Sequence, residues 1–314
     1  MNGFRVKRAH ELEALPQQAR WLIQNLWTAE AVGIIGGEPK SCKSFLALDM
    51  AVAVATGKPC LRTFQVTNPG KVLLFAAEDA LHIVRTRLDG ISRACEVSLE
   101  ELDIHVITRH TIRLDVVADR LALAETVERE QPRLLILDPF VRLHHIDENT
   151  SGEVAPLLQF LRSLQRRFQT AVAIVHHAKK GAANVRPGQA LRGSSEFHAW
   201  GDSNLYLRRV KDGLILSVEH RAASAPEPLA LELTEESETL ALRPARKLAT
   251  EPSPSEPTAS RILAILHACT NPLSIRQIRA QCHLRTQTVV DELERLVASK
   301  EVQKTAAGFR PLSA

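Results

Sequence analysis

The chain has 314 residues, of which 45% are hydrophobic and 24% charged, a composition typical of a globular protein with a sizeable core. Its net charge of +4 is a mild hint of a polyanionic partner and does not by itself establish nucleic-acid binding. Its 4% of aromatic residues argue against a groove that binds single strands mainly by stacking. The five cysteines form no CxxC pair, which argues against a zinc site and indicates free thiols in the cytoplasm. No apolar segment reaches the roughly 18 residues that span a bilayer, so no membrane association is expected.

Residues 1–29 are expected to be a lead-in segment, whose amphipathic part at 21–26 is predicted to form a helix that packs on the core. From residue 31 onward, short apolar runs alternate with stretches of helical periodicity. The runs AVGIIG, VLLFAA, DIHVIT, LLILD and AVAIVHH are predicted strands, and the predicted helices lie near 43–56, 80–94, 118–130 and 153–167. This alternation predicts βαβ units with a buried, mostly parallel sheet.

The pattern changes after Gly193 to three strands, SNLYLRRV, GLILSVEH and LALELT, with Lys211-Asp212-Gly213 as a hairpin turn. These strands are expected to continue the same sheet in antiparallel fashion, so that residues 30–245 form one α/β core. Residues 246–259 are rich in Pro, Ser and Thr and are predicted to be a linker. Residues 260–314 read as three amphipathic helices and a hairpin, which predicts a small winged helix-turn-helix domain.

Residues 37–44, Gly-Glu-Pro-Lys-Ser-Cys-Lys-Ser, lie between a strand and a helix, which is the setting of the phosphate-binding P-loop GxxxxGK[ST]. Lys43 is expected on the β- and γ-phosphates and the Ser44 hydroxyl on magnesium. Cys42 stands where a glycine is expected, and its Cβ crowds the loop. Lys40 either offsets this weakened contact or is a solvated loop lysine. The expected nucleotide-binding residues are Gly37, Glu38, Pro39, Lys40, Ser41, Cys42, Lys43, Ser44 and Phe45.

Polar residues end three of the predicted strands at the edge where open α/β sheets bind ligands. Asp138 ends LLILD in the Walker B arrangement and is expected, with Ser44, to hold Mg²⁺. Glu78 follows VLLFAA and is the candidate that polarises the attacking water, whereas the neighbouring Asp79 better suits an N-cap of the next helix.

The strand AVAIVHH ends in two histidines. His177 is the favoured γ-phosphate sensor, and His176 is then a structural histidine.

The segments WLIQNL, GEPKSCKSFLALDMAVAVATG, VLLFAAED, RLLILDP, VHHAKK and LRGSSE occur in an order that resembles the RepA-like branch of RecA-fold P-loop ATPases, which includes hexameric plasmid replicative helicases. The resemblance covers about residues 18–240. It implies a RecA-like core in a homo-oligomeric ring, expected to be hexameric, that binds ATP and Mg²⁺ between subunits. It also implies a catalytic set of Lys43, Glu78, His177 and Arg221, with Arg221 acting on the neighbouring subunit's nucleotide. The alternative for Arg221 is a surface arginine.

The same resemblance implies contact with DNA, expected to be single-stranded, through the loop 178–195. The basic residues of this loop are Lys179, Lys180, Arg186 and Arg192. The C-terminal domain has basic positions of its own at Arg276, Arg279, Arg285 and Lys300, but its third helix is acidic in the middle. Duplex recognition and contact with a protein partner therefore both stay open for this domain.

Two functions follow from the sequence. The first is an ATP-driven DNA motor or helicase that replicates a plasmid or another mobile element, which the four intact residues Glu78, Asp138, His177 and Arg221 favour. The second is an ATP-switched protein that binds DNA or recruits partners without helicase activity. Cys42 and the absence of a lysine beside Arg221 favour the second.

Overall fold

The computed structural model describes residues 4, 6–12, 16, 20–178, 193, 195–210, 213–236, 239–245, 258–269, 271–282, 286–299, 301–305 and 308–312. The chain divides into two compact units, Met1–Leu248 and Ala249–Ala314. The residues predicted to be a linker begin beside this division, and positions 246–257 lie outside the described part of the chain. No helix of the described residues is long and apolar enough to cross a membrane.

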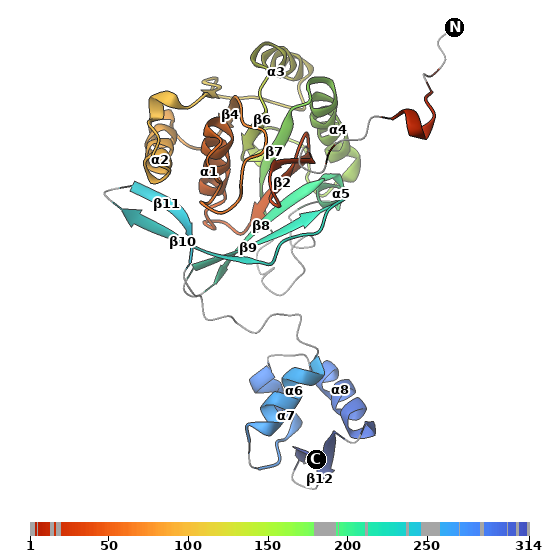
Figure 1. Ribbon diagram of the computed structural model, residues 1–314. Helices are drawn as coiled ribbons and strands as arrows, with labels where there is room; N and C mark the ends of the chain where they lie inside the picture. Colours follow the sequence, from red (N-terminus) through yellow and green to blue (C-terminus); the bar gives the residue numbers. More distant parts are fainter. Residues whose placement is uncertain are drawn as a thin grey trace. The chain divides into compact units, whose positions relative to one another are not determined.

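The first unit is built on a nine-stranded sheet in the order β11-β10-β9-β8-β3-β7-β6-β4-β5 (Figure 1). Its strands are β3 Val32–Gly37, β4 Val72–Ala76, β5 Ile104–Val106, β6 Leu134–Asp138, β7 Ala171–His177, β8 Ser203–Val210, β9 Gly213–His220, β10 Leu229–Glu236 and β11 Thr239–Pro244. Neighbours from β8 to β5 run parallel, and β9, β10 and β11 continue the sheet antiparallel. The predicted α/β fold class is confirmed.

Two details of the sheet differ from the sequence prediction. The strand SNLYLRRV, expected to begin the antiparallel part, pairs parallel with β3, and the antiparallel pairing starts one strand later at β9. An additional strand, β11, pairs with β10. Both differences arise from long-range pairing, which local periodicity does not encode. The hairpin residues Lys211 and Asp212 lie outside the described residues, between Val210 and Gly213, which pair directly.

Helices cover both faces of the sheet and enclose two hydrophobic clusters. One cluster lies under α1 (Lys43–Thr56) and α2 (Leu81–Ala94), and the other under α3 (Val117–Glu130) and α4 (Ser151–Phe168) (Figure 1). In the central strands β4, β6 and β7, successive residues alternate between the clusters, as the period of a strand requires. The short helices η1 (Ala9–Glu11), η3 (Leu99–Glu101), η4 (Phe140–Arg142) and α5 (Glu196–Trp200) complete the unit.

The predicted helix at 21–26 is wrong. The segment forms a hairpin of β1 (Trp21–Ile23) and β2 (Trp27–Thr28) instead. Asn25 has a φ of 60°, and this left-handed conformation reverses the chain between the strands. Leu22, Ile23, Leu26 and Trp27 are all buried. A short apolar run of this kind cannot be distinguished from a buried helix by periodicity alone.

An ion pair between the buried Asp49 and the partly buried Arg62 anchors α1, the helix that begins at the P-loop. Asp49 on α1 is 1% exposed and accepts hydrogen bonds from the Leu61 amide at 2.6 Å and from Arg62 Nη2 at 3.0 Å. The same arginine nitrogen donates to the Leu242 carbonyl on β11. Burial raises the pKa of Asp49, and the Arg62 charge opposes this rise. The contact therefore fixes α1 relative to the far end of the sheet.

The second unit contains α6 (Thr258–His267), α7 (Ile275–Cys282), α8 (Thr286–Ala298) and a hairpin of β12 (Val302–Thr305) with β13 (Gly308–Pro311). Its own hydrophobic cluster includes Ile262, Ile278, Val289 and Leu293. These are the elements expected of a winged helix-turn-helix, and that assignment stays a prediction. Arg276 and Arg279 are exposed on α7, whereas Arg285 and Lys300 lie outside the described residues.

Gly33 on β3 leaves no space for a side chain against the backbone of β8. A Cβ at this position would lie 1.7 Å from the Ser203 carbonyl oxygen and 2.9 Å from the Trp27 ring. We expect Gly33→Ala to lower the free energy of unfolding by about 2–4 kcal/mol, because β3 and β8 would have to separate. Thermal unfolding followed by tryptophan fluorescence measures this unit alone, because Trp21, Trp27 and Trp200 all belong to it.

Gly152→Ala is the matched control, since nothing lies within 4 Å of a Cβ built there on α4. It should leave stability unchanged or raise it by about 0.5–1 kcal/mol, because alanine favours a helix over glycine. An equal loss in both variants would contradict the packing of β3 against β8.

Candidate nucleotide-binding site

Four parallel strands end at one edge of the sheet and bring the predicted polar residues together. Ala76 of β4 pairs with Asp138 of β6, and the Ala77 amide donates to the Asp138 carbonyl at 2.7 Å. Gly37 of β3 pairs with His177 of β7. This edge therefore holds the P-loop and Asp138, with Glu78 directly after β4.

The P-loop makes a tight turn at residues 38–41, where the Ser41 amide donates to the Glu38 carbonyl at 3.3 Å. Lys40 has a φ of 62°, and with Pro39 before it the turn has the form of a type II turn, which favours glycine at the Lys40 position. Cys42 also has a φ of 62°, at the N-cap of α1. Two residues with side chains therefore adopt a left-handed conformation in this loop. Cys42 in place of the expected glycine strains the backbone and also fills space with its Cβ.

Lys43 and Ser41 present buried donors inside this loop. The Lys43 side chain is 5% exposed, and its Nζ donates to the Glu38 carbonyl at 2.8 Å. Burial lowers the pKa of Lys43, whereas the nearby charges of Asp138 and Glu78 raise it. The Ser41 hydroxyl is fully buried and has no hydrogen-bond partner among the described residues. These donors suit phosphate oxygens, which would satisfy them.

Asp138 lies at the bottom of a pocket of about 130 Å³ beside the P-loop. The pocket is lined by Ser44, Glu78, Asp79, Arg87, Asp138 and Pro139. Burial raises the pKa of Asp138 to about 6, and the charges of Asp79 and Glu78 act in the same direction. A hydrogen bond from Ser44 and the charge of Lys43 oppose the rise. A hydroxyl and carboxylates are the oxygen ligands that Mg²⁺ prefers, so the residues fit a magnesium ion with a nucleotide.

Three arginines of the site were not predicted from the sequence. Arg142 Nε donates to Glu78 Oε1 at 2.8 Å. Arg87 forms an ion pair with Asp79 and lies 5.1 Å from the centre of the Phe45 ring.

The third is Arg209 of β8, whose Nη2 donates to the Lys40 carbonyl at 2.7 Å. Arg142, four residues after the Walker B aspartate, and Arg87, two helical turns after Asp79, are close enough in sequence to have been candidates. Arg209 lies 169 residues from Lys40 in sequence, so no nearby motif indicated it.

The sequence indicated Asp79 as the N-cap of α2, but Asp79 does not cap this helix. The N-cap is Ala80, and no side chain accepts a hydrogen bond there. The carboxylate pairs with Arg87 instead. An arginine within reach offers a charged partner, which is stronger than a neutral backbone amide.

The two histidines that end β7 lie on opposite faces of the sheet. His176 is 1% exposed and stacks on Phe197, with ring centres 4.3 Å apart, on the face of α3 and α4. His177 is partly exposed and pairs along the backbone with Gly37, on the face of α1. This geometry favours His177 as the γ-phosphate sensor and His176 as structural, and both roles stay predictions.

Arg221 lies at the opposite edge of the sheet from the P-loop. Its amide donates to the Asp202 carbonyl at 2.9 Å, and the Asp202 amide donates to the carbonyl of Val32, the first residue of β3. The P-loop follows Gly37, the last residue of β3. Val32 and Gly37 are about 17 Å apart at 3.3 Å per residue. Arg221 Nη1 lies 3.4 Å from Asp202 Oδ1, and Nη2 donates to the Ala199 carbonyl. It therefore does not reach the P-loop of its own chain.

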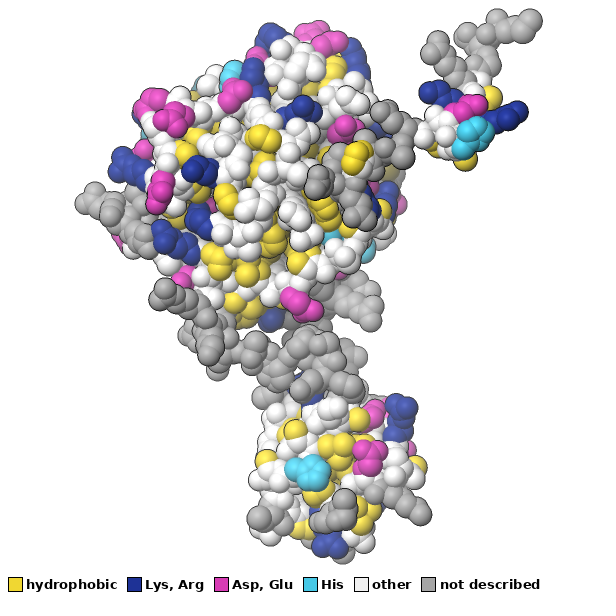
Figure 2. Space-filling model, in the orientation of Figure 1, with side chains coloured by type: hydrophobic (Ala, Val, Ile, Leu, Met, Phe, Trp, Pro, Cys, Tyr) yellow, Lys and Arg dark blue, Asp and Glu magenta, His cyan; other side chains and the backbone are white. Residues whose placement is uncertain are grey.

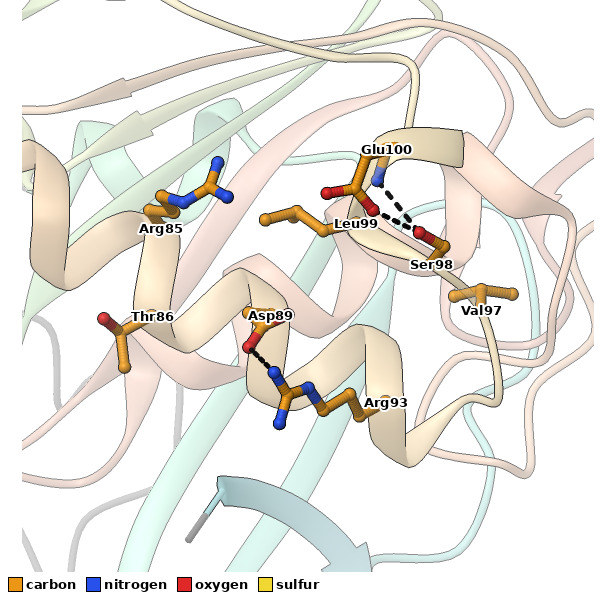
Figure 3. A pocket seen from close by; sticks show the side chains of 8 residues that line it. All are labelled: Arg85, Thr86, Asp89, Arg93, Val97, Ser98, Leu99 and Glu100. Atoms are coloured by element: carbon orange, nitrogen blue, oxygen red, sulfur yellow. Dashed lines mark hydrogen bonds and ion pairs between the residues drawn. The ribbon is translucent and has the colours of Figure 1, made fainter.

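A second surface hollow of the unit, about 450 Å³, is not part of this site. It lies between α2 and η3 and is lined by Arg85, Thr86, Asp89, Arg93, Val97, Ser98, Leu99 and Glu100, none of which belongs to the P-loop or its carboxylates (Figure 3). Arg93 pairs there with Asp89 at 2.8 Å. The smaller pocket is the functional candidate, because it holds the buried charges. The four predicted DNA-binding residues, Lys179, Lys180, Arg186 and Arg192, lie outside the described residues.

Residues 4–183 match the family model AAA_25, described as an AAA domain. The chain belongs to this family. A solved DnaB-like replicative helicase, studied with its interactions with primase, is similar over 68% of this chain and 57% of its own, at 13% identity and a TM-score of 0.52. The RadB recombinase is similar over 68% of this chain and 90% of its own, at 15% identity and a TM-score of 0.49.

The family match and the helicase together identify the first unit as a RecA-like P-loop fold. The predicted AAA_25-type P-loop family is confirmed, and the likeness to the replicative helicase is one of fold. The chain spans little more than half of the helicase that it resembles.

The raised pKa of Asp138 predicts a pH-dependent stability. The Asp138 carboxyl has a pKa of about 6 in the folded protein and 3.8 in the unfolded chain, so it binds its proton more tightly when folded. The free energy of unfolding therefore falls as the pH rises from 4 through 6 and the buried carboxyl becomes charged. In EDTA and without nucleotide, Asp138→Asn should raise the free energy of unfolding at pH 8 by about 3 kcal/mol. Urea unfolding followed by tryptophan fluorescence at pH 8 and pH 4 measures the difference, which should nearly vanish at pH 4.

Proposed function

We propose that the protein binds and hydrolyses ATP. The observation that carries this is the convergence of the buried Lys43 amine, the Ser44 hydroxyl and the carboxylates of Glu78 and Asp138 at one sheet edge. Each group suits a separate task in phosphoryl transfer, and charge stabilisation counts for more in a buried site than in water.

The side chains divide the chemistry in the following way. Lys43 leaves the Glu38 carbonyl and binds the β- and γ-phosphates, together with the amides at the start of α1. Ser44 and Asp138 hold Mg²⁺, which neutralises phosphate charge when it is bound. Glu78 polarises the attacking water and takes its proton, and Arg142 orients the Glu78 carboxylate.

The proposal extends to a homo-oligomeric ring, expected to be hexameric, in which Arg221 completes the neighbour's site. Its position at the far edge of the sheet supports a role between subunits over a role in its own site. In the single chain, Arg221 donates to carbonyls at the end of α5, so it would exchange these partners for a phosphate.

Within the proposal, the ring acts on DNA, expected to be single-stranded, as a RepA-like replicative helicase or motor of a plasmid or mobile element. On the face of the described residues in Figure 2, Lys and Arg side chains are interspersed with Asp and Glu. This face offers no continuous basic track, so the proposed contact rests on the loop with Lys179, Lys180, Arg186 and Arg192.

A second candidate function is an ATP-switched protein that binds DNA or recruits a partner without helicase activity. The left-handed Lys40 and Cys42 favour it, because each places a residue with a Cβ in a strained conformation within the phosphate loop. Strand-displacement assays with ATP distinguish the two functions: DNA-stimulated hydrolysis without unwinding supports the second.

Glu78→Gln should bind ATP as the parent does and hydrolyse it at least about a hundredfold more slowly, because the proton acceptor is lost. Lys43→Ala should instead lose binding, since it removes the main cation from the phosphates. Equilibrium binding of a fluorescent ATP analogue and phosphate release measure the two steps. Tight binding by Lys43→Ala would refute the phosphate site, and unchanged turnover in Glu78→Gln would transfer the role to another carboxylate.

Arg221→Ala should bind ATP nearly normally and hydrolyse it slowly. Mixed with Glu78→Gln subunits, it should regain part of the parent activity, because some interfaces then combine an intact Glu78 with an intact Arg221. Native mass spectrometry verifies that the oligomers are mixed. Absence of rescue in verified mixtures would leave Arg221 as a structural or DNA-contacting residue.

A further inference from the structure

Arg209 joins β8 to the P-loop, across 169 residues of sequence. Leu207 of β8 pairs with Gly37 of β3, and Arg209 follows two residues later on the same side of the strand. Its guanidinium donates to the Lys40 carbonyl at 2.7 Å, although the arginine side chain is exposed. A hydrogen bond from a charged donor is about twice as strong as a neutral one.

The segment that Arg209 holds is the one with the unusual backbone. Lys40 and Cys42 both have a φ of 62°, and this conformation costs roughly 1–2 kcal/mol for each residue that is not glycine. Ser41 lies between them, and its amide closes the turn on Glu38 through a long bond of 3.3 Å. Because a trans peptide keeps its carbonyl and amide on opposite sides, a fixed Lys40 carbonyl also fixes the Ser41 amide.

We propose that Arg209 is a positioning residue of the P-loop, which holds residues 40–42 in the conformation that glycines would adopt without strain. Its effect on ATP rests on the proposed function, whereas its effect on the loop does not. The charge of Arg209 also acts on Cys42, which stands where the motif has a glycine. Burial raises the pKa of the Cys42 thiol, and the charges of Arg209, Lys43 and Arg87 oppose that rise. The alternative role is a direct contact of Arg209 with a phosphate.

The first test needs no nucleotide. Hydrogen–deuterium exchange of the peptide that covers residues 37–45 should be at least about threefold faster in Arg209→Gln than in the parent, because the turn opens more often. Peptides of α4 should be unchanged. Arg208→Gln is the matched control, since Arg208 is also exposed and its side chain lies on the other face of β8. Equal exchange of the loop in Arg209→Gln and the parent would overturn the proposal.

The second test is a double-mutant cycle with Cys42→Gly, read as the Kd for a fluorescent ATP analogue. Arg209→Gln should weaken binding about tenfold in the parent and less than about threefold in the Cys42→Gly background, where the loop depends less on the arginine. Arg208→Gln should change the Kd less than about twofold in either background. The same loss in both backgrounds would show a direct phosphate contact and overturn the positioning role.

The two tests separate this inference from the proposed function. A parent protein that binds no ATP, but whose loop exchange still rises in Arg209→Gln, would refute the function and support the positioning role. Normal ATP binding with no effect of Arg209→Gln on loop exchange would support the function and refute the positioning role.

Discussion

The parallel register of β3, β4, β6 and β7 is the constraint on which the site depends. Their carboxyl ends share one edge, where Ala76 pairs with Asp138 and Gly37 with His177. A slip of β6 by one residue would turn Asp138 toward the cluster under α3 and α4, away from the P-loop. Leu134 to Leu137 are fully buried, whereas Arg133 before them is exposed. A slip would move Arg133 or Asp138 into this buried stretch, which disfavours it. The packing of the core thus determines where the charges lie.

The site brings charges into a setting that disfavours them. Lys43 and Asp138 are both nearly buried, and burial moves the pKa of each toward its neutral form. Their mutual attraction offsets only part of this effect, and Glu78 and Asp79 add like charge around Asp138. A bound phosphate and magnesium ion would supply the charges that this arrangement lacks. A site of this kind gives up stability in the free protein in favour of ligand binding.

In the P-loop, the contact with Arg209 stabilises a conformation that glycine residues would adopt without support. Glycine adopts the left-handed conformation at no steric cost, whereas Lys40 and Cys42 require support from outside the loop. Arg209 holds the Lys40 carbonyl from one side, and the amide of Ala178 after β7 donates to the Gly37 carbonyl from the other. Arg221 lies at the sheet edge that its own P-loop does not occupy, so only in the proposed ring would it complete a nucleotide site.

The sequence by itself determined the elements whose signal is local. The strand-then-helix pattern around residues 37–44 indicated the P-loop, and the apolar run that ends in Asp138 placed that residue at a strand end, because both patterns depend on neighbours within a few residues. Buried parallel strands read as continuous apolar runs, so the α/β class followed as well. The motif order added the RecA-like relationship that the family match confirms.

Tertiary structure alone decided the features that join distant segments. The run at 21–26 was predicted to be a helix and forms a hairpin, because its apolar residues pack on the core and its short length gives no reliable periodicity. The parallel direction of β8 and the contacts of Arg209 and Arg221 depend on which strands become neighbours. Strand pairing over more than a hundred residues is a property of the whole packed sheet, and no window of sequence contains it.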